Sequence, residues 1–318
     1  MNVDAIGGFL PLELTPGRSY HFGLACESLN TARNCLEYLL IVENYERVFL
    51  PYFLCDALME PIHRRNVKFE FYYLDELLEP VFDFNLLKEK DGFLYINYFG
   101  IKDEYVQSLV KKGKNVILDN AQAFFAIPRP GVNAFYSARK FFGVPDGAYL
   151  YTKVKLKDAL ELDFSYTRME HLIRRIDQHA ESAYNRFLLN ENELKNQPIR
   201  LMSKLTNAIL ASVSYSEHKL IRKDNFFYYH NKLKDKNLLK IGYLNFEGPL
   251  SYPFWVKDPS IKQILLEHRI YTPTYWPNII TDSDSSRLEF QLASEIVHLP
   301  VDQRYSRREL DYILKLIE

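Results

Sequence analysis

The sequence predicts an α/β fold, with a large domain built on a mostly parallel sheet and a small C-terminal α+β domain. Short apolar segments alternate with longer segments of helical periodicity up to residue 160, which is typical of a parallel sheet covered by helices. Residues 158–225 are then polar and helical with almost no strand signal, and shorter elements of both kinds follow. We therefore expect a large domain at 1–225, with a helical extension after about residue 157, and a small domain at 226–318.

Each element of the large domain follows from residue spacing or from a stop signal. Residues 31–42 carry apolar side chains at helical spacing, and the helix at 102–112 ends before Gly113, a good C-cap. Apolar runs and alternating segments predict the strands. The predicted helices are 31–42, 56–64 and 102–112, and the predicted strands are 47–50, 67–73, 92–98, 115–118, 133–136 and 148–152.

The second half of the chain gives fewer strand signals. Apolar side chains at spacings of four predict one amphipathic helix over 195–216. The remaining predicted elements are strands at 243–246, 252–256 and 296–300 and helices at 260–268 and 306–317.

Composition narrows the class of protein. The 318 residues carry a net charge of −1, so no global field favours nucleic acid, and no apolar run is long enough to cross a bilayer. The N-terminus has no signal-peptide pattern and the three cysteines form no CxxC pair, so we expect a cytoplasmic protein with reduced thiols and no metal site. The aromatic content of 15% indicates flat side chains buried in a core or an interface, which fits a dimer.

Two predicted strand ends carry candidate chemistry. Asp119 ends one strand, and Lys140 follows the next strand with Ser137 three residues before it. In α/β sheets ligands gather at the carboxyl ends of strands. An amine, a carboxylate and a hydroxyl there are what a pyridoxal phosphate (PLP) enzyme needs, because they can form a Schiff base, pair with the pyridine nitrogen and reach the phosphate. A plainer interpretation remains open, in which Asp119 is an N-cap and Lys140 forms a solvated basic pair with Arg139.

Two further features could complete such a site. Ser28, Asn30 and Thr31 precede the helix at 31–42, and a helix N-terminus is a good anion site. A plain Ser or Asn N-cap would explain the same residues. Gln122, three residues after Asp119, could contact the cofactor ring.

Several segments, in order along the chain, resemble one family. They are 28–32 (SLNTA), 48–51 (VFLP), 96–100 (INYFG), 116–123 (VILDNAQA), 135–140 (FYSARK), 146–148 (DGA), 275–277 (YWP) and 298–300 (HLP). Together they resemble the PLP-dependent aminotransferases of fold type I, in particular the DegT–StrS type sugar aminotransferases. The resemblance runs over most of the chain, and 116–123 is its most specific match.

This resemblance implies a fold and a role for individual residues. The large domain would have the three-layer, aspartate aminotransferase-like PLP-transferase fold. Lys140 would form the internal aldimine and carry the proton, Asp119 would pair with the pyridine nitrogen, and Gln122 would lie near the ring. Three more side chains would hold the phosphate, namely Ser28, Asn30 and Ser137. In the expected homodimer, Asn185 would reach the phosphate of the partner subunit.

Three positions depart from the family pattern but fall where it contacts the cofactor. Leu29 replaces the glycine of the phosphate loop, and Asn97 replaces a common histidine. Cys55 stands about where the family places an aromatic residue on the cofactor ring, although Phe53 is nearby. We include all three among the expected cofactor-binding residues.

The resulting hypothesis is an aminotransferase. It would move an amino group from an amino donor, with glutamate expected, to a keto-sugar or another small carbonyl compound. Another PLP reaction, such as that of a lyase or a dehydratase, is one alternative, although sugar dehydratases of this family usually lack the lysine that Lys140 supplies. A PLP-fold binding protein that has lost its chemistry is the other. Neither nucleic acid nor a membrane is expected as a partner.

Overall fold

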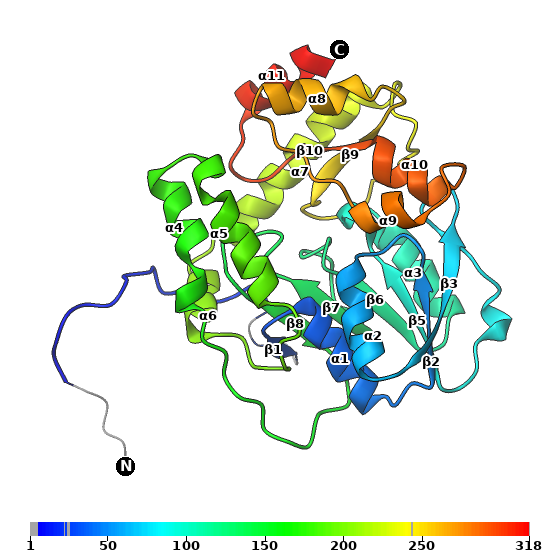
Figure 1. The fold of residues 1–318 in the computed structure, drawn as a ribbon, viewed down its shortest axis with the longest axis vertical. Coiled ribbons are helices and arrows are strands. Elements are labelled where there is room, and N and C mark those ends of the chain that lie inside the picture. Colours follow the sequence, from blue (N-terminus) through cyan, green and yellow to red (C-terminus); the bar gives the residue numbers. More distant parts are fainter. Residues whose placement is uncertain (1–5, 22, 24–25, 243, 318) are drawn as a thin grey trace.

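In the computed structural model, which describes residues 6–21, 23, 26–242 and 244–317, eight strands form one large sheet (Figure 1). Their order across the sheet is β1-β8-β7-β6-β5-β2-β3-β4. The strands are β1 (Glu27–Leu29), β2 (Arg47–Pro51), β3 (Lys68–Leu74), β4 (Pro80–Val81), β5 (Asp91–Ile96), β6 (Val116–Asn120), β7 (Asn133–Ser137) and β8 (Ala148–Tyr151).

The sheet is parallel at its centre and antiparallel at its edges. Strands β7, β6, β5, β2 and β3 pair in parallel, whereas β8, β1 and β4 join antiparallel. The central strands read as continuous runs in which every residue of β5 and β6 is buried, as expected where both faces of a sheet are covered. The predicted mostly parallel sheet is confirmed.

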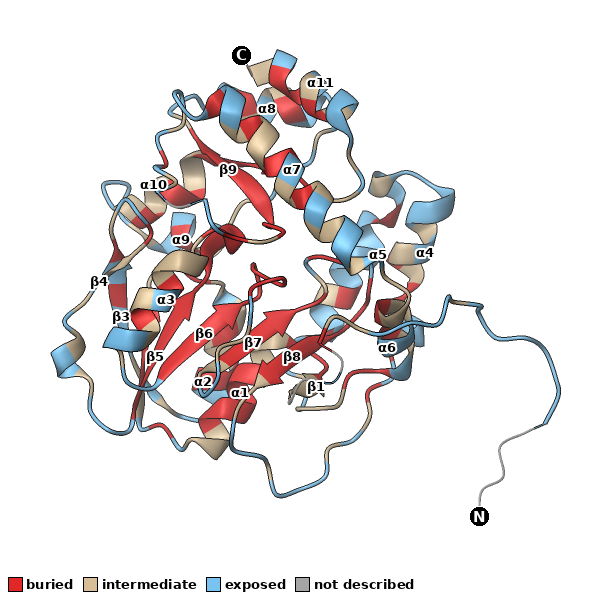
Figure 2. Cartoon of the chain, turned by 180° about the vertical axis from the view of Figure 1, so that it is seen from behind, coloured by how far each residue is buried: buried red, intermediate tan, exposed pale blue. Residues whose placement is uncertain are grey.

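Helices cover both faces of this sheet and make three layers. Helices α1 (Ala32–Val42) and α2 (Met59–Arg64) lie on the face seen in Figure 1, and α3 (Asp103–Lys112) lies on the face seen in Figure 2. α1 begins at its N-cap Thr31, whose hydroxyl accepts the N–H of Asn34. α3 ends at the predicted Gly113.

The helical extension is present but is divided differently from the prediction. It consists of α4 (Glu170–Asp177), α5 (Ala180–Glu193), α6 (Lys204–Ala211) and α7 (Tyr215–Leu233). The single helix predicted over 195–216 is wrong, because Leu201 forms bridges with Leu29 and Leu162 instead of continuing a helix. α6 begins only after Ser203, whose hydroxyl accepts the N–H of Thr206.

The C-terminal elements form a smaller layer beside the carboxyl ends of the parallel strands. They are α8 (Ser260–Glu267), α9 (Pro277–Asp282), α10 (Leu288–Glu295), α11 (Arg307–Ile317) and the antiparallel pair β9 (Ser251–Trp255) and β10 (Ile296–Pro300). The strand predicted at 243–246 is not seen at 244–246, and residue 243 lies outside the described residues. The domain change predicted at residue 225 falls inside α7, which continues without a break into this layer.

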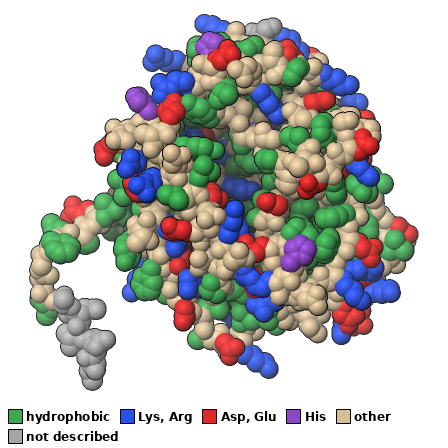
Figure 3. All heavy atoms as spheres, viewed as in Figure 1, with side chains coloured by type: hydrophobic (Ala, Val, Ile, Leu, Met, Phe, Trp, Pro, Cys, Tyr) green, Lys and Arg blue, Asp and Glu red, His purple; other side chains and the backbone are tan. Residues whose placement is uncertain are grey.

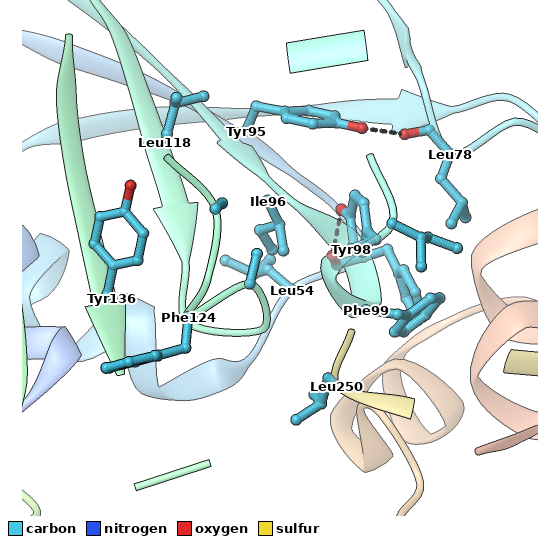
Figure 4. Close-up of a cluster of buried hydrophobic side chains, with 14 of the residues drawn as sticks. Leu54, Leu78, Tyr95, Ile96, Tyr98, Phe99, Leu118, Phe124, Tyr136 and Leu250 are labelled. Atoms are coloured by element: carbon cyan, nitrogen blue, oxygen red, sulfur yellow. Dashed lines mark hydrogen bonds between the residues drawn. The ribbon is translucent and has the colours of Figure 1, made fainter. Parts of the chain in front are cut away.

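Aromatic side chains fill much of the core, in line with the composition. Figure 2 shows that strands β5, β6, β7 and β8 are buried along most of their length, and Figure 4 shows aromatic side chains clustered near the ends of β5 and β6. The hydroxyl of Tyr95 donates to the carbonyl of Leu78 (2.9 Å), and that of Tyr98 donates to the carbonyl of Phe53 (2.8 Å). These bonds satisfy the polar ends of rings that are otherwise packed in apolar surroundings. Among the described residues, no helix is long and apolar enough to cross a membrane.

Candidate active site

Four neighbouring parallel strands deliver the predicted site residues to one edge of the sheet. Cys55 follows β2 and Asn97 follows β5. Asp119 is the second-last residue of β6, and Lys140 follows β7. Because β7, β6, β5 and β2 are adjacent and parallel, their carboxyl ends meet at the same edge. The C-terminal layer lies across that edge, since the N–H of Leu250 donates to the carbonyl of Phe99 (2.9 Å).

Lys140 is exposed and lies in a turn after β7, not on a helix. The face of the molecule in Figure 3 is hollowed near its centre, and Lys or Arg side chains lie inside the hollow. Within the described part of the chain no carboxylate pairs with Lys140, and its Nζ lies 5.8 Å from the centre of the Tyr275 ring. Arg139, by contrast, pairs with Glu191 on α5 and is largely buried, so the two residues are not a solvated basic pair.

Asp119 is a buried carboxylate within electrostatic reach of Lys140. Burial raises its pKa to about 6, while the charge of Lys140 and a hydrogen bond from the N–H of Ala121 (2.8 Å) act in the opposite direction. No helix starts directly after β6, so Asp119 is not an N-cap. At neutral pH the site therefore holds an ionised carboxylate that its surroundings disfavour.

Gln122 has one satisfied and one unsatisfied polar atom. Its Oε1 accepts the N–H of Phe99 (2.9 Å), which fixes the side chain, whereas the buried Nε2 has no hydrogen-bond partner. A buried amide without an acceptor costs on the order of 1–3 kcal/mol. The orphaned donor indicates that a ligand atom belongs beside it.

Cys55 and Phe53, the two candidates for the position on the cofactor ring, differ in their surroundings. Burial raises the pKa of the Cys55 thiol, and the charge of Lys140 lowers it, which places the thiol near the amine. The ring of Phe53 is fully buried against Tyr98 and Trp276, at centroid distances of 5.6 and 4.7 Å. Phe53 is therefore part of the core, whereas Cys55 is within electrostatic reach of Lys140.

The segment predicted to hold a phosphate is mostly engaged in folding. Leu29 is completely buried in β1, and the side chain of Asn30 has four hydrogen bonds. Its Oδ1 accepts from Thr31, Asn34 and Arg200, and its Nδ2 donates to Pro198. Leu29 has no polar side-chain atom, and the amide of Asn30 is already held at both its Oδ1 and its Nδ2. Ser28 is half-buried in β1.

The three remaining residues predicted to contact the cofactor lie in different surroundings. Asn97 is fully buried, its Nδ2 donates to Asp103 (2.6 Å) and Asn120 (3.2 Å), and its Oδ1 accepts the N–H of Lys102 (3.0 Å), so it stabilises the start of α3. Ser137 is buried at the end of β7, close in sequence to Lys140. Asn185 is exposed on α5, and its contact with a partner subunit stays a prediction.

Sequence reasoning gave no individual role to Tyr275 or His298, although both lie in segments matched to the family and 271–277 was expected to contact the substrate. The rings of Tyr275 and His298 are 4.7 Å apart, and His298 lies 4.6 Å from the ring of Phe99. Burial lowers the pKa of His298 to about 3, so this imidazole is neutral at physiological pH. No local pattern indicates that a loop before α9 would meet Lys140.

The residues present fit a PLP molecule in their central part. An unpaired amine, a buried carboxylate and an orphaned amide donor lie at one strand edge, and each matches one group of the cofactor ring. No three His, Cys, Asp or Glu side chains come together as a metal site within the described residues.

Comparisons with known proteins support the fold. No protein-family model matches the sequence, and no curated protein matches it. A DegT DnrJ EryC1 StrS aminotransferase from Brucella abortus is similar over 92% of this chain and 84% of its own, with 15% identity and a TM-score of 0.60. The sugar aminotransferase CalS13 from Micromonospora echinospora matches over 92% and 86%, with 15% identity and a TM-score of 0.59. NtdA from Bacillus subtilis, with bound cofactor PMP, matches over 92% and 73%, with 14% identity and a TM-score of 0.61.

These similarities run through nearly the whole chain, not through the sheet alone. The predicted α/β fold is therefore confirmed as the fold that these aminotransferase structures share.

Proposed function

We propose that the protein is a PLP-dependent aminotransferase. It would transfer an amino group from an amino donor, with glutamate expected, to a keto-sugar or another small carbonyl compound. The observation that carries this proposal is the meeting of Lys140, Asp119 and the orphaned Nε2 of Gln122 at one edge of the sheet. The shared fold adds support, because one similar structure contains PMP and another is a sugar aminotransferase.

The residues of the chain divide the work as follows. PLP, when bound, supplies an electron-poor ring that can take up electrons from the substrate. Lys140 would hold the cofactor covalently and, when released, move a proton between substrate and cofactor with its Nζ. Asp119 would accept a hydrogen bond from the ring nitrogen at Oδ2, since its Oδ1 already accepts the N–H of Ala121. Gln122 would donate from Nε2 to a ring oxygen.

Only some of the side chains predicted to hold the phosphate are available for it. Ser137 and Ser28 are the hydroxyls that remain for it, because Leu29 and Asn30 are committed to the core and to the 198–200 segment. The N-terminus of α1 adds backbone N–H groups and a favourable dipole.

We also propose a homodimer that works in the cytoplasm. Helices α4 and α5 expose apolar side chains that a monomer would leave in water, namely Ile173, Ile176, Tyr184, Phe187, Leu188 and Leu189. Asn185 lies on the same helix α5 as several of them, so a partner that covers this surface would also approach Asn185. The described cysteines Cys26, Cys35 and Cys55 are all free thiols, as a reducing compartment would allow.

The test is a half-reaction followed by absorbance. PLP-loaded protein mixed with glutamate, without any acceptor, should lose the absorption of the lysine-bound cofactor and gain that of the amine form, and 2-oxoglutarate should appear in equal amount. A panel of other amino donors identifies the donor if glutamate is inactive. If no donor converts the cofactor although it is bound, the reaction is not a transamination.

A further inference from the structure

Among the described residues, Tyr275 is the aromatic residue whose ring lies beside the lysine amine. Its ring centre lies 5.8 Å from Nζ of Lys140, within the range of a cation–π interaction. No carboxylate pairs with this amine among the residues that the structure describes. The charged and titratable groups around it are Asp119 from β6, Cys55 after β2 and Tyr275 itself.

The position of this ring is fixed from two sides. His298 on β10 packs edge-on against it at 4.7 Å, and Phe99 lies parallel to it at 6.4 Å. His298 is held in turn by Ser251 on β9, whose hydroxyl lies 3.1 Å from its Nδ1. The C-terminal strand pair therefore sets where the Tyr275 ring stands.

Phe99 contacts both the Tyr275 ring and Gln122. Its N–H donates to Oε1 of Gln122 (2.9 Å), and its carbonyl accepts the N–H of Leu250 (2.9 Å). Because Phe99 is held at both backbone groups, the Tyr275 ring has a rigid wall behind it. The neutral imidazole of His298 adds no charge that would repel the amine.

We propose that Tyr275 is a positioning residue that holds the amine of Lys140 while that amine is not bonded to the cofactor. The proposal rests on the proposed function, since amino transfer requires Lys140 to be free whenever the cofactor carries the amino group. The ring face attracts the ammonium form and keeps it beside the site instead of in solvent. Release to the cofactor then needs only a small movement of one side chain.

The test uses the ligand-free protein and the chemical reactivity of Lys140. The protein is treated with acetic anhydride at fixed neutral pH, and acetylation of the Lys140 peptide is measured by mass spectrometry relative to the other lysines. Tyr275→Leu should acetylate Lys140 about twofold to fivefold faster, since the loss of a cation–π contact frees the amine. Tyr275→Phe, which keeps the ring, should behave like the wild type.

A matched pair elsewhere in the chain provides the control. Nζ of Lys102 lies 5.3 Å from the Tyr105 ring, so Tyr105→Leu should leave the reactivity of Lys140 unchanged. Equal Lys140 rates in Tyr275→Leu and the wild type would overturn the proposal, and so would a rise in all lysines together, which reports loosening of the fold. A Tyr275→Phe variant that behaves like Tyr275→Leu would assign the effect to the hydroxyl and contradict a role of the ring.

This experiment is separable from the proposed function. If the wild-type protein binds no PLP, the proposed function fails whatever the acetylation shows. If PLP binds and is converted by a donor but Lys140 reacts alike in all variants, only the role of Tyr275 fails.

Discussion

Two regions were predicted to hold the same cofactor: the carboxyl ends of β6 and β7, and the segment before α1. They differ in whether the protein itself satisfies their polar side chains. At the strand ends, neither Lys140 nor Nε2 of Gln122 has a polar partner within the described part of the chain, and burial raises the pKa of Asp119. Before α1, Asn30 has four side-chain hydrogen bonds and Leu29 is part of the core. A binding site leaves groups unsatisfied for its ligand, whereas a structural segment satisfies its own.

The largest expected effect is a loss of stability caused by a mutation in the segment before α1. Asn30→Ala removes four side-chain hydrogen bonds, two of which join the end of β1 to the 198–200 segment and two of which join it to the start of α1. We expect the free energy of unfolding to fall by about 2–4 kcal/mol, measured with urea. Ser28→Ala serves as the control and should change the free energy of unfolding by less than about 0.5 kcal/mol, because the Ser28 hydroxyl forms no hydrogen bond with the described residues. A stable Asn30→Ala protein that fails to bind PLP would instead make Asn30 a ligand residue.

At the carboxyl end of β6, by contrast, a mutation of Asp119 should stabilise the ligand-free protein. The pKa of Asp119 is raised from 3.8 to about 6, so the folded state pays for the ionised form above that pH. Asp119→Asn should therefore be more stable than the wild type by about 2–3 kcal/mol above pH 6. Because both folded and unfolded states bind the proton below pH of about 4, the gain should shrink as the pH falls from 6 to 4. A gain that is independent of pH would contradict a raised pKa.

The same variant should lose cofactor affinity. A charge-assisted hydrogen bond between carboxylate and ring nitrogen contributes about 1.5–3 kcal/mol, so Asp119→Asn should bind PLP about 10–100 times more weakly in a spectroscopic titration. The matched control is Asp103→Asn, because burial also raises the pKa of Asp103 to about 6 but its side chain accepts from Asn97. Equal losses in the two variants would mean that the effect is not specific to the ring.

The smallest expected effect concerns the phosphate. Ser137→Ala should weaken PLP binding about threefold to tenfold through the loss of one hydrogen bond. Pyridoxal, which lacks the phosphate, should bind the wild type and the variant alike. If both ligands weaken equally, Ser137 supports the strand end and not the phosphate.

The sequence was informative where chemistry follows from position along a strand. Asp119 and Lys140 could be found because apolar runs mark the strands, and parallel strands end at one edge. Strands β2, β3, β5, β6, β7 and β8 were found for the same reason, whereas the short edge strands β1 and β4 were not predicted.

The parts that could not be predicted depend on contacts between distant segments. From the sequence, Asn30 is a polar residue before a helix that could bind a phosphate. In the structure its Nδ2 donates to the carbonyl of Pro198, 168 positions along the chain. The same long-range pairing places Leu201 beside Leu29 and breaks the helix that periodicity predicted over 195–216. Tyr275 lies in a segment that matches the family, but its place beside Lys140 depends on contacts with Phe99 and with His298 on β10, which are far from it in sequence.

The most direct test of the central claim is to trap the cofactor on its lysine. The protein is mixed with PLP, reduced with borohydride and digested, and the modified peptide is identified by mass spectrometry. We predict a single modification at Lys140, visible also as loss of the absorption of the lysine-bound cofactor, and none in Lys140→Ala. Modification spread over surface lysines, or equal trapping in Lys140→Ala, would contradict the assignment of this strand edge as the active site.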